Sequence, residues 1–74
     1  MDNELYKALK SKYKATIREH EYNVKVWLKT PTLTPEHMNI VGEIDRAMTI
    51  IADYEGRLLT LERLHDETTP DLYH

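Results

Sequence analysis

The clearest pattern of chemically active side chains is a row of cations in the first part of the chain. Six basic residues fall within about 100° of one another on a helical wheel: Lys7, Lys10, Lys14, Arg18, Lys25 and Lys29. Because a row of cations can neutralise phosphates, this face is a candidate contact for nucleic acid or for an acidic protein. The alternative is a solvated face whose repulsion is relieved by acidic residues from the second half of the chain. The formal net charge of -3 favours this alternative.

A second candidate is a metal site. Glu62 and His65 form an E-x-x-H pair, which places both side chains on one face of a helix, as in di-iron bundles. Glu4 could supply the further carboxylate. The alternative is a helix C-terminus at which His65 complements the helix dipole. We favour it, because the pattern is short and all three residues would lie at the open end of a hairpin, so no metal or other cofactor is predicted.

The residue types in this chain give little support for a catalytic function. The chain has no cysteine, its only serine is Ser11, and it contains two glycines, too few for a glycine-rich phosphate loop. None of its carboxylates forms a recognisable acid/base pair. The sequence therefore predicts a protein without catalytic residues, one that is not an enzyme.

The first element that positions these side chains is a helix over about 4–29. This segment contains no glycine or proline and is rich in Leu, Lys, Ala, Glu and Arg, which are good helix formers. It should end near Thr30, because the residue before a proline, here Pro31, is driven out of the helical region. We expect a turn over 30–33.

A second helix is predicted over about 35–66. Thr34 can cap it, Pro35 suits the first helical position, and Glu36 places negative charge at the positive end of the helix dipole. Residues 67–74 read as a flexible C-terminal tail.

Both helices carry an apolar stripe. In the first helix the stripe comprises Leu5, Leu9, Tyr13, Thr16, His20, Val24 and Trp27. In the second, alternating steps of four and three give a coiled-coil seam of Ile40, Ile44, Ala47, Ile51, Tyr54, Leu58 and Leu61. Gly42, Thr49 and Gly56 form a strip of small residues on the back of this helix, a candidate contact surface for another protein. The alternative is that the two glycines are simply tolerated at exposed positions.

The short connection makes the two helices antiparallel neighbours, so residues 1–66 are expected to form one all-α hairpin. Their charges attract, since residues 1–30 carry a net +3 and residues 31–74 a net -6. At one edge of the contact, Lys12 is expected at the level of Glu55.

A 74-residue chain without disulfides has a marginal core, and a lone hairpin leaves part of each stripe in water. Self-association into a homodimeric four-helix bundle or a higher oligomer is therefore expected. The predicted interface comprises Leu9, Tyr13, Val24, Trp27, Ile40, Ile44, Ala47, Ile51, Tyr54, Leu58 and Leu61.

These features predict a non-enzymatic assembly or adaptor protein that acts through helix–helix contacts with itself and with a protein partner, as small accessory proteins of phages or plasmids do. In shape alone, the expected dimer resembles the plasmid copy-number regulator Rop, an acidic homodimer of helical hairpins that binds RNA through its first helices. That resemblance implies the alternative of a Rop-like or packaging-type nucleic-acid-binding protein. The N-terminus lacks the apolar stretch of a signal peptide, and no apolar run is long enough to span a bilayer. A cytoplasmic protein without membrane contact is expected.

Overall fold

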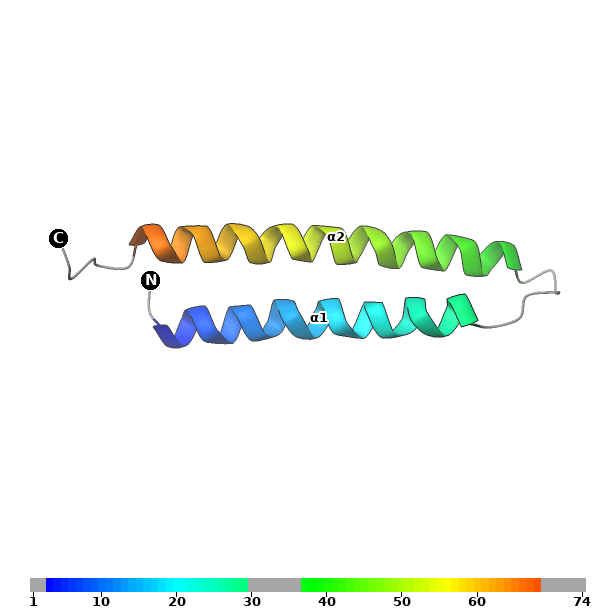
Figure 1. Ribbon diagram of the computed structural model, residues 1–74, viewed down its shortest axis with the longest axis horizontal. Coiled ribbons are helices and arrows are strands. Elements are labelled where there is room, and N and C mark those ends of the chain that lie inside the picture. The colour runs from blue at the N-terminus through cyan, green and yellow to red at the C-terminus, as the bar shows by residue number, and fades with distance from the viewer. Residues whose placement is uncertain (1–2, 30–36, 69–74) are drawn as a thin grey trace.

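The chain folds into two helices that pack against each other. The computed structural model describes residues 3–29 and 37–68, which form α1 (Asn3–Lys29) and α2 (His37–Thr68) (Figure 1). The predicted all-helical hairpin is thus confirmed. The predicted turn, the Thr34 cap and the last six residues of the predicted tail lie outside the described residues.

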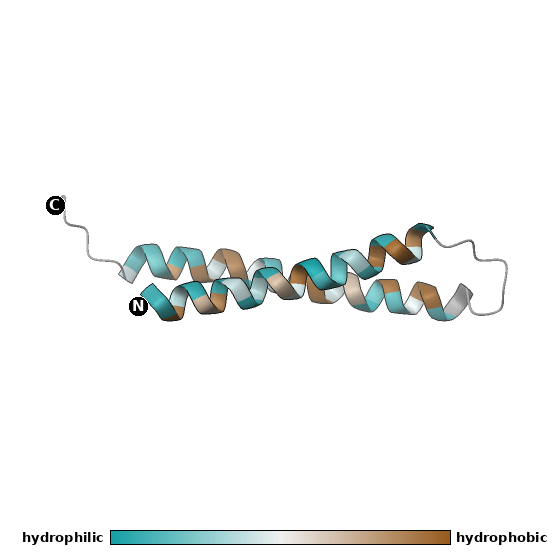
Figure 2. Ribbon diagram, turned by 90° about the horizontal axis from the view of Figure 1, so that it is seen from below, coloured by the Kyte–Doolittle hydropathy of each residue, from teal (hydrophilic) through white to brown (hydrophobic). Residues whose placement is uncertain are grey.

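The two helices lie side by side and antiparallel along almost their whole length (Figure 1). A view turned by 90° shows that they cross at a shallow angle (Figure 2). The Cα atoms extend only 16 and 15 Å in the two shorter directions, which is the thickness of a single pair of helices. Neither described helix is long and apolar enough to cross a membrane.

The second helix ends two residues later than the predicted end near Asp66. Its last turn is held by side chains: Arg63 bonds to Glu67 at 2.8 Å, and the Thr68 hydroxyl donates to the Leu64 carbonyl oxygen at 3.0 Å. The polar residues taken as the start of the tail therefore extend the helix, because they satisfy one another and the final carbonyl groups.

The core is a single layer between the helices. Five apolar side chains are buried, and no polar side chain is buried among the described residues. The buried residues are Ile17, Val24, Ala47, Ile51 and Leu61. The side chains packed around them are half-buried: Trp27, Ile44, Tyr54 and Leu58. The α2 members of these two sets are Ala47, Ile51, Leu61, Ile44, Tyr54 and Leu58. All six belong to the predicted stripe of the second helix, so that stripe does face α1.

The predicted stripe of α1 is right for six of its seven residues, which are buried or half-buried, but it is offset toward one edge. Ile17, which the prediction omitted, is buried, whereas Thr16 is half-buried and its hydroxyl donates to the Lys12 carbonyl oxygen at 3.0 Å. Leu5, at one end of the predicted stripe, is 67% exposed. The helix is rotated about its axis so that its most apolar side chain in this turn, Ile17, contacts α2. The other edge of the stripe is left partly in water.

Candidate interaction surfaces

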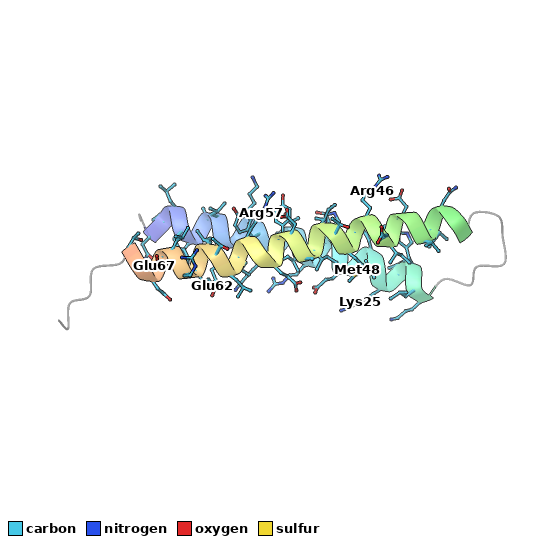
Figure 3. The ribbon with its side chains drawn as sticks, turned by 90° about the horizontal axis from the view of Figure 1, so that it is seen from above. Lys25, Arg46, Met48, Arg57, Glu62 and Glu67 are labelled. Atoms are coloured by element: carbon cyan, nitrogen blue, oxygen red, sulfur yellow. The ribbon has the colours of Figure 1, made fainter. Side chains whose placement is uncertain are left out.

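The hairpin has two long lateral faces, one on each side of the line along which the helices meet. Arg46 and Arg57 point to one side, and Lys25, Met48 and Glu62 point to the other (Figure 3). We call the first the Arg57 face and the second the Lys25 face. Each carries grooves between the helices, and the two faces differ in chemistry.

A wide groove lies on the Arg57 face and has a volume of about 650 Å³. Leu9 and Tyr13 line it from α1. From α2 it is lined by Ala52, Asp53, Gly56, Arg57, Thr60, Leu61 and Leu64. We call it the Leu9 groove. Its α2 side combines small residues with leucines, so a further helix could approach closely here.

The wall of the Leu9 groove is held by aromatic and charged contacts. The Tyr13 and Tyr54 rings pack edge to face with their centroids 5.6 Å apart. The Arg57 guanidinium lies 4.5 Å from the Tyr54 ring centroid and forms an ion pair with Asp53 at 3.0 Å. Tyr54 thus connects the core to a fixed charge at the rim of the groove.

A second groove of about 290 Å³ lies on the same face, nearer the C-terminal end of α1. His20, Asn23 and Trp27 line it from α1, opposite Arg46 and Ile50 of α2. The His20 Nδ1 atom lies 2.8 Å from the Thr16 carbonyl oxygen, and because a carbonyl only accepts, this nitrogen donates. The histidine of the predicted stripe is therefore half-buried and bonded within its own helix.

The Lys25 face has a smaller groove of about 270 Å³, with apolar Val24, Met48 and Ile51 framed by charged Lys25 and Glu55, and by Glu21. The predicted row of cations runs beside it along α1. Its exposed members are Lys7, Lys14, Arg18, Lys25 and Lys29. Acidic side chains of α2 therefore lie across the groove from basic side chains of α1.

Lys10 departs from this row. Its ammonium group lies 3.8 Å from a carboxylate oxygen of Glu62 and donates to the Tyr6 hydroxyl at 3.3 Å, so the side chain is half-buried. Lys12 and Glu55, which are expected at one level, form no ion pair with each other within the described residues. Relief of the cation row by α2 is thus present at one position among the described residues, where Glu62 pairs with Lys10.

The open end of the hairpin is closed by an aromatic stack. The rings of Tyr6 and His65 lie 3.7 Å apart at an interplanar angle of 15°, and His65 Nδ1 is 3.9 Å from a carboxylate oxygen of Asp66. Both residues of the E-x-x-H pair thus contact α1, Glu62 through a cation and His65 through a ring. No group of three or more His, Cys, Asp or Glu side chains that could hold a metal ion occurs among the described residues.

Two features of these surfaces were not predicted from the sequence: the burial of Ile17, and the contact of Tyr6 and Lys10 with Glu62 and His65. Tyr6 and Lys10 are spaced i,i+4, which places them on one helix face. That spacing was the available signal, although their partners on α2 depend on the register of the two helices.

The arrangement offers two long surfaces suited to binding by contact: an Arg57 face with one wide and one narrower groove, and a Lys25 face whose groove has apolar side chains framed by charged ones. The predicted interface residues Val24, Ala47, Ile51 and Leu61 are occupied by the contact between the two helices of one chain. Their role between chains stays a prediction. This chain matches no protein family model, and no curated protein or solved structure matches it.

Proposed function

We propose that this chain is a non-enzymatic assembly or adaptor protein that acts through helix–helix contacts, first with a second copy of itself and then with a protein partner. The observation that carries this proposal is the amount of apolar surface the hairpin leaves in water. Among the described residues, eight large apolar side chains are exposed: Leu5, Tyr22, Val26, Leu28, Val41, Met48, Leu59 and Leu64. As part of this proposal, the chain acts in the cytoplasm as an accessory protein of a phage or plasmid.

The arrangement of the helices supports the proposal. Among the described residues each helix packs against only one other helix, so its remaining sides stay in water. Association of two copies would cover part of this surface.

The experiment that tests the proposal is a mass measurement in solution. Light scattering and sedimentation velocity should give at least twice the chain mass of 8.8 kDa at micromolar concentration. Because folding and association form one equilibrium in such proteins, the helical content should also fall on dilution. A fully helical particle of 8.8 kDa that does not change on dilution would refute the proposal.

A second candidate function is nucleic-acid binding by the row of cations. The observation in its favour is that Lys14, Arg18 and Lys25 are exposed and make no ion pair within the described residues. Lys10 is removed from the row by Glu62, and acidic side chains of α2 border the same face, which makes this candidate the weaker one.

If the row binds nucleic acid, replacing Lys14, Arg18 and Lys25 together with glutamine should weaken binding of RNA or DNA about tenfold or more. The slope of log Kobs against log salt is negative, and its magnitude should decrease by about two to three, roughly one for each lost phosphate contact. Electrophoretic mobility and fluorescence anisotropy at several salt concentrations measure both. Lys12→Gln, an exposed lysine outside the row, is the control. Unchanged mobility of RNA and DNA with the native protein would exclude this function.

A further inference from the structure

We infer that the second copy docks on the Arg57 face in the parallel sense, so that each α1 lies beside the α2 of its partner. The two copies are then related by a twofold axis parallel to the helices, and the C-terminal ends of both copies of α1 lie at the same end of the bundle. This inference rests on the proposed self-association and adds to it the face and the orientation.

The grooves select the Arg57 face. Among the grooves that described residues line, it carries the Leu9 groove of about 650 Å³ and the groove beside Trp27 of about 290 Å³, and the groove on the Lys25 face has about 270 Å³. The edge of the predicted α1 stripe that the helix rotation leaves in water, from Leu9 to Trp27, borders these two grooves. A second copy on this face would cover the part of the stripe that α2 does not cover, and the exposed lysines of the opposite face would stay in water.

The charge of each helix selects the parallel orientation. Among described residues, α1 carries seven basic and three acidic side chains, a net +4, and α2 carries three basic and seven acidic, a net -4. The alternative is an opposed orientation, in which the second copy runs in the antiparallel sense. There α1 lies beside the α1 of its partner and α2 beside the partner's α2, so like charges meet over the length of the bundle. In the parallel orientation each positive helix lies between two negative ones. Neighbouring helix axes are only about 8–10 Å apart, which is close to the screening length of physiological salt, so this difference persists in solution.

The register within the hairpin agrees with the parallel orientation. The stack of Tyr6 on His65 fixes the start of α1 at the level of the end of α2. Leu5 and Leu64, next to these two rings, are therefore at one level, and they are 67% and 40% exposed. A parallel partner would bring its own Leu64 to the level of Leu5, so each exposed leucine would gain an apolar neighbour.

Gly56 marks the point of closest approach. A Cβ atom placed on Gly56 or on Gly42 would meet nothing within 4 Å, so the isolated hairpin requires neither glycine. Gly56 lines the Leu9 groove and Gly42 does not. Alanine raises helix propensity at either glycine by a similar amount, so Gly42→Ala is the matched control. Gly56→Ala should dimerise about tenfold more weakly than Gly42→Ala, because a packed helix contact tolerates extra volume poorly.

The orientation is tested by distances between spin labels. The chain has no cysteine, so a single cysteine can carry the label. For labels at Lys29→Cys, the parallel dimer predicts a separation below about 30 Å, because the two positions lie across one bundle of helices. The opposed dimer predicts at least about 39 Å, the length of α1 at ~1.5 Å per residue. A label at Ala15→Cys, near the middle of α1, gives a short distance in both orientations and reports that a dimer has formed.

The outcomes separate the inference from the function on which it rests. A short distance at both sites, with Gly56→Ala weaker than Gly42→Ala, supports the inference. A short distance at Ala15→Cys with a long one at Lys29→Cys overturns the orientation, and equal affinities of the two alanine variants overturn the face; self-association survives in both cases. A monomeric mass with no coupling between labels at either site removes the proposed function as well.

Discussion

Replacing Ile51 with aspartate should abolish both folding and association. Ile51 is 7% exposed and lies in the core cluster with Ile17, Val24 and Ala47. An unpaired carboxylate at this position would destabilise the fold by about 4 kcal/mol or more, while a core of this size supplies only ~3–5 kcal/mol in total. Circular dichroism should show loss of helix at 25 °C, and sedimentation should show no dimer.

The matched control is Leu59→Asp. It makes the same change of residue type in the same helix, but Leu59 is 70% exposed. Leu59 lines neither groove of the Arg57 face, so the change in the free energy of unfolding should stay within about 0.5 kcal/mol, as for other surface substitutions. An Ile51→Asp variant that stays helical as a monomer would show that Ile51 is not in the core that holds the two helices together.

Tyr54→Ala should have the second-largest effect, a loss of roughly 2 kcal/mol in the free energy of unfolding. The half-buried ring loses its apolar burial, its edge-to-face contact with Tyr13 and its contact with the Arg57 guanidinium. For a chain of this size, that loss lowers Tm by about 8–16 °C. Thermal denaturation followed by circular dichroism at fixed protein concentration measures it.

Two variants control for this result. Tyr22→Ala removes a ring that is 68% exposed and should lower Tm by no more than a few degrees. Tyr54→Phe keeps the ring and its contacts with Tyr13 and Arg57, and no hydrogen bond of the Tyr54 hydroxyl occurs within the described residues, so it should retain most of the stability. If Tyr54→Ala and Tyr22→Ala have equal effects, the ring contacts of Tyr54 contribute nothing to folding.

The helices could be predicted because their signals are local. The residue before a proline is driven out of the helical region, and α1 does end at Lys29, two residues before Pro31. The antiparallel pairing followed from the short connection. The end of α2 was harder to place, because Thr68 and Glu67 favour helix only through bonds to residues one turn earlier.

The rotation of α1 could not be predicted from its own sequence. Thr16 and Ile17 are adjacent, and the stripe could pass through either residue with a similar count of apolar side chains. The choice depends on how many of these side chains α2 can cover at once, which is a property of the pair of helices. Ile17 is therefore buried, and Leu5 is exposed.

The contacts at the open end were unpredictable for a related reason. The stack of Tyr6 on His65 joins residues 59 positions apart in the sequence. Sequence spacing gives the face on which each residue lies, but the level at which the two faces meet depends on packing along the whole hairpin. A shift of α2 by one turn would give Tyr6 a different neighbour.

The contacts between α1 and α2 are nested around one connection, and this has a consequence for how the chain acquires its structure. Tyr13 meets Tyr54, and farther from the connection Tyr6 meets His65, so each outer pair encloses the inner one. Once an inner pair has formed, the next requires ordering of only the few residues between them, and the added loss of chain entropy is small. The kinetic barrier is therefore concentrated in the first encounter near the connection, and later pairs follow rapidly. In the reverse direction, separation begins at the two chain ends and proceeds inward.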